Sequence, residues 1–141
     1  MKTRSKTALF LMELILIIAF FAVSTSVCMR IFVYAKTTSD YARNLSSAVS
    51  RAQSAAECFK GTGADVQKTK EILGGLDFKN GLCIFYDESF AKTDDAESAC
   101  FTLFLIPLYE KGDKNCAEVS VLDKNDGVLF AIQAKAVDYG K

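Results

Sequence analysis

One apolar segment near the N-terminus constrains what this chain can fold into more than any other feature. Residues 8–29 are almost entirely apolar. As a helix they would measure about 33 Å, which is enough to cross the hydrocarbon core of a bilayer. Glu13 carries the only charge in this segment. A charged side chain inside a membrane costs a few kcal/mol even on the gentler insertion scales, so Glu13 is a candidate functional residue.

The charges around this segment predict an orientation. Lys2, Arg4 and Lys6 precede it with no acidic residue among them. The positive-inside rule therefore predicts a single-pass protein of the cell membrane, with a cytoplasmic N-terminus and an extracytoplasmic C-terminal domain. Over the whole chain 17 basic residues balance 17 acidic ones, so bulk charge gives no reason to predict nucleic acid as a partner.

The composition also limits the chemistry. The chain has no histidine, which removes Ser-His-Asp and Cys-His catalysis as well as imidazole metal ligands. No pair of carboxylates is spaced for acid–base work. We therefore predict no catalytic residues, no metal site and no cofactor, and we do not expect an enzyme.

Three interpretations of the N-terminal segment remain open on these grounds. It fits a secretory signal cleaved near Ser24-Thr25-Ser26, which would release a soluble binding domain. It also fits a plain signal-anchor helix that holds an extracytoplasmic binding domain without polymerising. The third interpretation is a leader of the prepilin type, from which only the basic peptide is removed. This one accounts for Glu13 as well as for the length and the flanking charges.

The third interpretation is a family resemblance carried by Ala8-Leu9-Phe10-Leu11-Met12-Glu13-Leu14. This stretch resembles the start of type IV pilins and of the pseudopilins of type II secretion, where a short basic leader and a Gly precede Phe-Thr-Leu-Ile-Glu-Leu. Ala8 stands where the Gly is expected, Leu9 would become the new N-terminus, and Glu13 matches the family's Glu. Ala8 and Leu9 depart from the family pattern at the two positions that flank the cut.

The resemblance implies a fold, a function and partners. It implies an α+β fold in which a long N-terminal helix packs on an antiparallel sheet. A prepilin peptidase would remove residues 1–8, and an assembly platform and ATPase would insert the subunit among other pilin or pseudopilin subunits of a cell-surface fibre. Glu13 would pair with the freed amine of a neighbouring subunit, which would offset part of the desolvation cost of both groups.

The residues beyond the apolar segment predict the same fold independently. Nothing between residues 30 and 60 stops a helix, because this range contains no Pro or Gly, and Gly61-Thr62-Gly63 then ends it. Small and aromatic residues recur there at steps of three and four and predict a stripe that packs on the sheet: Tyr34, Tyr41, Leu45, Ala48, Ala52, Ala55 and Phe59.

The predicted domains are a leader at 1–8, a transmembrane helix at 9–29 and an extracytoplasmic domain at 30–141. Residues 61–81 form a connecting region with a short helix from Ala64 to Leu73 and a turn at Lys79-Asn80-Gly81. Residues 82–135 form a four-stranded antiparallel sheet, with strands at 82–86, 99–109, 116–122 and 128–135. We expect the polar stretch 87–98 to be an exposed loop and residues 110–115 to form a turn.

The cysteines and one acidic turn complete the candidate sites. Four cysteines outside the apolar segment permit three pairings, so one or two disulfides are possible among Cys58, Cys83, Cys100 and Cys116; buried free thiols are the alternative. Asp123, Asn125 and Asp126 before Gly127 favour a hairpin turn stabilised by Asx side chains over a calcium loop.

Overall fold

The computed structural model describes residues 2–109 and 115–137, with side chains from Lys6 onward. The predicted turn at 110–115 therefore lies almost entirely outside the described residues. The chain divides into two compact units, residues 1–42 and 43–141. The elements in chain order are α1 (Lys2–Gly61), α2 (Val66–Leu73), β1 (Leu76–Phe78), β2 (Gly81–Tyr86), β3 (Lys92–Thr93), β4 (Phe101–Pro107), β5 (Cys116–Asp123) and β6 (Val128–Lys135).

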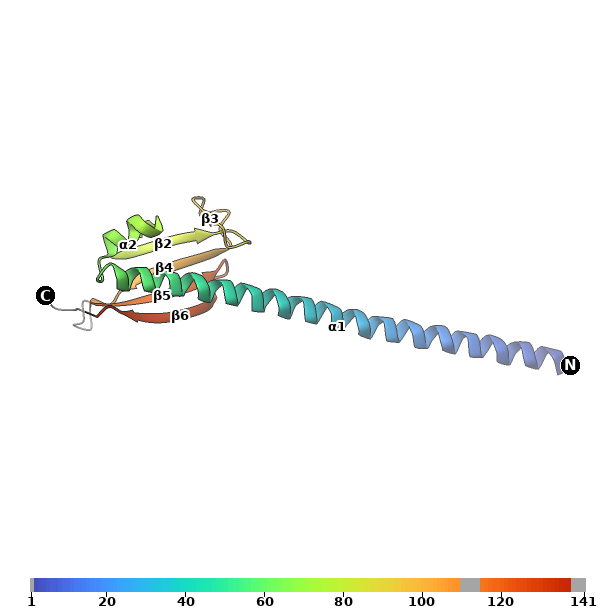
Figure 1. The fold of residues 1–141 in the computed structure, drawn as a ribbon. Coiled ribbons are helices and arrows are strands. Elements are labelled where there is room, and N and C mark those ends of the chain that lie inside the picture. The colour runs from blue at the N-terminus through green and yellow to red at the C-terminus, as the bar shows by residue number, and fades with distance from the viewer. Residues whose placement is uncertain (1, 110–114, 138–141) are drawn as a thin grey trace. The chain divides into compact units, whose positions relative to one another are not determined.

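Helix α1 accounts for the whole described part of the first unit and for the start of the second. Its end at Gly61 is where the Gly-Thr-Gly breaker predicts it. Within the second unit, the C-terminal part of α1 (green in Figure 1) lies against one face of the sheet. The predicted α+β fold, a long N-terminal helix packed on an antiparallel sheet, is confirmed.

The sheet has six strands rather than the four predicted. Its order is β1-β2-β4-β5-β6, all neighbours are antiparallel, and β3 pairs with β2 beside this path. The four predicted strands correspond to β2, β4, β5 and β6. The two that the prediction missed have three and two residues, which is too short for an alternating pattern to be visible in the sequence.

The hydrophobic core lies between α1 and this sheet. Ala48, Ala52, Ala55 and Phe59 are buried on the helix, and each leaves at most 1% of its surface exposed. The small side chains let the helix approach the sheet closely, where it meets Leu82, Leu103, Leu105, Val119 and Val121. The predicted stripe is therefore correct from Ala48 onward.

The N-terminal part of that stripe is not buried. Leu45 is half-buried, and Tyr34 and Tyr41 belong to the first unit with exposures of 74% and 57%. Tyr34 and Tyr41 lie on the same helix as the buried residues, so they continue the same three- and four-residue spacing without being buried themselves. Spacing alone does not show where burial begins.

Only one face of the sheet is covered by the described helices. Along β4, Phe101, Leu103 and Leu105 are buried, whereas Thr102, Phe104 and Ile106 are half-exposed. This alternation is the period-two pattern of a strand with one face against a core. On the half-exposed face, Phe78 of β1 packs against Phe104, with ring centroids 4.7 Å apart.

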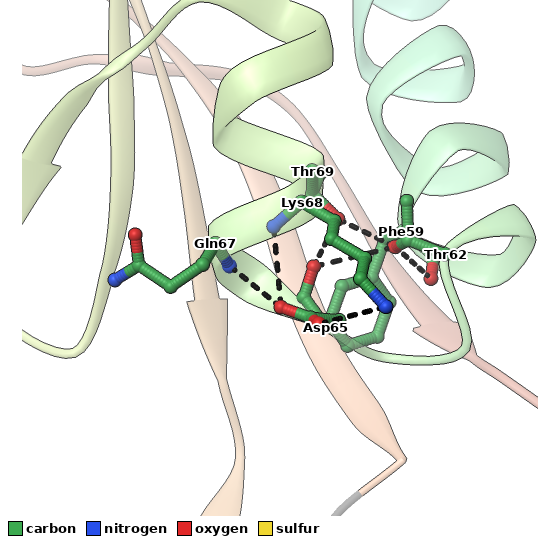
Figure 2. A network of polar contacts seen from close by, with 6 residues as sticks. All are labelled: Phe59, Thr62, Asp65, Gln67, Lys68 and Thr69. Atoms are coloured by element: carbon green, nitrogen blue, oxygen red, sulfur yellow. Dashed lines mark hydrogen bonds and ion pairs between the residues drawn. The ribbon is translucent and has the colours of Figure 1, made fainter.

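Thr62 and Thr69 connect the end of α1 to the start of α2 (Figure 2). Their hydroxyl oxygens are 2.7 Å apart, and the Thr69 hydroxyl also donates to the carbonyl of Asp65 at 2.7 Å. Because the Thr69 proton goes to Asp65, the Thr62 hydroxyl donates to the Thr69 oxygen, and it also lies 3.0 Å from the carbonyl oxygen of Phe59, the most C-terminal core residue of α1. Thr69 is fully buried. These bonds satisfy the buried Thr69 hydroxyl and fix the turn between the end of α1 and the start of α2.

Asp65 is the N-cap of α2. Its Oδ1 accepts hydrogen bonds from the backbone N–H groups of Gln67 at 3.0 Å and Lys68 at 3.2 Å. These bonds occupy two donors that have no partner inside the helix. The Lys68 N–H bond lowers the pKa of Asp65 below its ordinary value of 3.8, with further help from the Lys68 charge and the Gln67 N–H.

This cap makes stability depend on pH in one direction. Because folding lowers the pKa of the Asp65 carboxyl, this group stabilises the fold above pH 3.8. The stabilisation is lost as the pH falls through the lower pKa that Asp65 has in the folded protein. We expect Asp65→Ala to lower the unfolding midpoint at neutral pH, and the difference from wild type to shrink progressively as the pH falls below 3.8. Asp65→Asn, which keeps an accepting oxygen, should lose less. Thermal melts followed by circular dichroism across this range test the prediction; a pH-independent difference would contradict it.

The stretch 87–98 is not a simple exposed loop, contrary to the prediction. Phe90 has a left-handed φ of 59° and is buried, with its ring stacked on that of Phe101 at 4.2 Å. Arg51 of α1 donates to the Phe90 carbonyl at 3.0 Å and lies 5.4 Å from the centre of the Tyr86 ring. Asp87 supports the turn by accepting from the backbone N–H groups of Ser89 and Ala91. The segment is thus attached to the core through its one aromatic side chain.

Candidate functional site

The candidate site is the N-terminal part of α1, where apolar side chains are not covered by any described part of the chain. One helix, Lys6–Gly61, is long and apolar enough to cross a membrane; its most apolar window has a mean hydropathy of 2.4 and no buried residue. Large side chains such as Leu9, Ile15 and Phe20 have exposures of 65%, 66% and 68%. Each would gain about 1.5–3 kcal/mol on full burial, so this surface requires a covering that the described chain does not supply.

The residues predicted for leader cleavage and assembly all lie on this surface. Ala8, Leu9 and Glu13 are helical and exposed. Leu9 and Glu13 are four residues apart, so they lie one above the other on the same face of α1. Among the described residues, no hydrogen bond or ion pair is found for the Glu13 carboxylate. Its predicted partner is therefore not within the described chain.

Removal of residues 1–8 would change the electrostatics around Glu13. The intact helix has no acidic residue in its first turn. A chain beginning at Leu9 would have lost three basic residues, and it would hold Glu13 one turn from a new α-amine and from the positive end of the helix dipole. Between Leu9 and Met29 the only two charges would then be this amine and the Glu13 carboxylate. The geometry lets them neutralise each other, either within one chain or between neighbours.

Two hydroxyl groups in the apolar part of α1 are satisfied within the helix. Ser24 donates to the carbonyl of Phe20 and Thr25 to that of Phe21, each at 2.9 Å. Such bonds to the residue four positions earlier let Ser and Thr lie in an apolar helix without an unsatisfied donor. The sequence identifies Ser24-Thr25-Ser26 only as small residues near a possible cleavage site and does not predict these bonds.

Of the four cysteines of the second unit, Cys58 lies on α1, Cys83 and Cys116 lie on strands, and Cys100 directly precedes β4; no disulfide joins described residues. Cys83 lies opposite Phe104, and Cys100 precedes Phe104 by four residues, so about 13 Å separate them along the strands. Cys116 begins β5, at the far end of β4 from Cys100. A disulfide needs Cα atoms within about 7 Å, so the register disfavours a bond between any two of these three. Pairing of Cys58 with one of them stays a prediction.

Cys58 and Cys83 are free thiols in this structure, and both should be slow to react. Burial raises the pKa of both thiols, and the charge of Asp77 raises that of Cys83 further. Because the thiolate is the reactive form, we expect iodoacetamide to modify them at neutral pH at least about tenfold more slowly in the folded protein than in guanidinium. Peptide mass spectrometry over time gives both rates; equal rates would show that the thiols are not protected.

Other kinds of site find less support. Within the described ranges, no three Cys, Asp or Glu side chains come together as metal ligands would. The acidic turn is an Asx turn, since Asp123 Oδ1 accepts from the N–H groups of Asn125 at 2.8 Å and Gly127 at 2.9 Å. Comparison with protein-family models, with curated proteins and with solved structures finds no match.

Proposed function

We propose that this chain is a pilin-like structural subunit that is held in the cell membrane by the N-terminal part of α1 and is built into a fibre through that helix. The observation that supports this proposal most is the uncovered apolar surface of α1 with a single carboxylate near its start. A bilayer would cover this surface before assembly. The helices of neighbouring subunits would cover it in the fibre.

The energetics are consistent with membrane storage despite Glu13. Each Leu, Ile, Phe or Val in the apolar segment favours insertion by roughly 0.3–0.6 kcal/mol, and the segment contains about a dozen of them. Their sum outweighs the cost of one carboxylate, which lies only about a turn inside the membrane edge and can extend toward the headgroups. Glu13 is therefore tolerated in the membrane, and pairing with a neighbour's amine would improve its surroundings further.

In this proposal the partners follow from the steps of assembly. A prepilin peptidase removes residues 1–8 on the cytoplasmic side. An assembly platform and its ATPase then move the subunit out of the bilayer into a stack of pilin or pseudopilin subunits, with the second unit on the extracytoplasmic side. The proposed role is structural: the chain provides a surface that packs in the fibre, and it does not catalyse a reaction.

A fractionation experiment tests the proposal. The full chain is produced together with a prepilin peptidase and a fibre assembly machine, and sheared fibres are separated from membranes. We expect the chain in both fractions, and in membranes alone when the peptidase is inactivated. A chain that stays in the membrane with an active peptidase would instead support a non-polymerising anchored binding domain, and a chain found free in solution would support a secreted one.

A further inference from the structure

The exposed apolar surface of α1 does not end with residues 8–29. Arg30 interrupts it, and large side chains continue directly after this residue. These are Ile31, Phe32, Val33 and Tyr34, with exposures of 63%, 67%, 55% and 74%. Beyond them lies Lys36, an exposed residue whose Nζ is 3.4 Å from Asp40 Oδ1. The surface that requires a covering therefore extends to residue 35.

Arg30 has no anionic partner within reach along α1. The chain contains no acidic residue between Glu13 and Asp40. The neighbours of Arg30 one turn away on the same face, at positions 26, 27, 33 and 34, are all uncharged. Among the described residues, no hydrogen bond or ion pair is found for its guanidinium. Arg30 is thus a charged residue inside an apolar surface, and its partner must come from outside the described chain.

The length of this surface matches the full thickness of a bilayer. Residues 8–35 would measure about 42 Å as a helix, and a bilayer with its headgroup regions measures about 40–45 Å. Glu13 and Arg30 are about 26 Å apart along the helix, and residues 21 and 22 are the midpoint of this pair and of the whole segment. With these two residues at the bilayer centre, each charged residue lies only about 2 Å inside a hydrocarbon core of about 30 Å.

We propose that residues 21 and 22 lie at the centre of the bilayer and that the Arg30 guanidinium binds lipid phosphate in the outer leaflet. This inference rests on the membrane storage proposed above. The aliphatic part of Arg30 lies along the apolar surface while its head extends outward, as long basic side chains do near the ends of membrane helices. A planar guanidinium suits phosphate because it can donate two parallel hydrogen bonds. Tyr34 then lies in the interfacial region, where tyrosine is enriched.

A membrane that covered residues 9–29 alone would be less favourable at both ends. It would leave Ile31, Phe32 and Val33 beside water. It would also place the bilayer centre at residue 19, so Glu13 would lie about 6 Å inside the hydrocarbon edge instead of about 2 Å. A deeper carboxylate reaches the headgroups less easily. The proposed position covers three more apolar side chains and lowers the cost of Glu13 at the same time.

Tryptophan fluorescence tests this position, since the chain contains no Trp of its own. Single variants of the full chain are reconstituted in vesicles of phosphatidylcholine and phosphatidylglycerol, and quenching by lipids brominated at defined acyl positions gives the depth of each Trp. Phe10→Trp and Phe32→Trp should lie at depths equal within about 2 Å, with Phe21→Trp as the reference near the centre. A Trp at position 32 that lies about 6 Å further from the centre than one at position 10, as a span of 9–29 requires, would overturn the proposal.

The outcomes distinguish this inference from the proposed function. A chain that does not co-sediment with the vesicles would contradict membrane storage and would overturn both proposals. A chain that is inserted, but with position 32 clearly shallower than position 10, would overturn this inference alone. The fibre proposal would then stand.

A charge reversal tests the role assigned to Arg30. In the Phe32→Trp protein, adding Arg30→Glu places an anion beside the lipid phosphates, so the helix should shift and move position 32 outward. We expect quenching to fall by about twofold or more, whereas Arg30→Lys should retain it. Lys36→Glu is the matched control, because it makes the same charge change beyond the apolar surface and should leave quenching unchanged. Equal quenching in Arg30→Glu and Lys36→Glu would overturn the assignment of Arg30 to lipid phosphate.

Discussion

Replacing Glu13 by alanine is expected to remove the subunit from fibres while leaving it in the membrane. Inside a fibre the freed α-amine at Leu9 would be buried among apolar helices, and without its carboxylate partner it would remain an uncompensated charge. Breaking a buried ion pair in this way costs about 3–5 kcal/mol. We therefore expect at least a hundredfold fall in the ratio of fibre to membrane protein, measured by quantitative immunoblotting of the two fractions.

Two features make this result specific to the carboxylate. Removing a charge from an apolar segment favours membrane insertion, so the Ala variant should be retained in membranes at least as well as wild type. Glu13→Gln keeps the size and polarity of the side chain without the charge, and it should show most of the same defect. Normal incorporation of both variants would mean that Glu13 has no role in assembly.

Among the glycines that the structure describes, Gly81 is the one whose exchange for alanine is expected to destabilise the second unit most. A Cβ at Gly81 would lie 1.9 Å from the carbonyl oxygen of Leu105, and that atom belongs to the backbone of β4. It cannot rotate away as a side chain would. The pairing of β2 with β4 would have to open next to Leu82 and Leu105, both fully buried. We expect a loss of about 3 kcal/mol or more in the free energy of unfolding.

Gly61→Ala is the matched control for this experiment. Gly61 is the last residue of α1, and a Cβ there would meet no atom within 4 Å. Alanine suits a helix better than glycine, so this variant should be unchanged or more stable by about 0.5–1 kcal/mol. Urea denaturation of the two variants gives the comparison. A Gly81→Ala protein as stable as Gly61→Ala would show that β2 and β4 do not approach as closely as described.

The long helix and the main strands could be predicted from sequence because their signals are local. The unbroken run before Gly61 and the small-residue spacing from Ala48 to Phe59 fix a helix and its buried face. The alternation at Phe101–Pro107 likewise fixes a strand with one side against the core. These patterns depend on the neighbours of each residue along the chain and on nothing else.

What the sequence could not reveal depends on contacts between distant residues. Gly81 looked like part of a turn, whereas its lack of a side chain is required by β4, which passes over it. Phe90 looked like a loop residue, and only the position of Arg51 and Phe101 explains its burial. Tyr34 and Tyr41 continue the spacing of the buried stripe although they are exposed. The absent partner of Glu13 is a case of the same kind, because that partner is expected on another molecule.

The mass of the mature chain shows whether the basic leader is removed. We predict that the protein extracted from membranes of cells with an active prepilin peptidase begins at Leu9, and that it begins at Met1 when the peptidase is inactivated. Intact-mass and N-terminal peptide measurements distinguish these forms without ambiguity. A chain that still carries residues 1–8 in the presence of the active peptidase, or one cut near Ser26, would contradict the assignment of Ala8, Leu9 and Glu13 to leader removal and assembly.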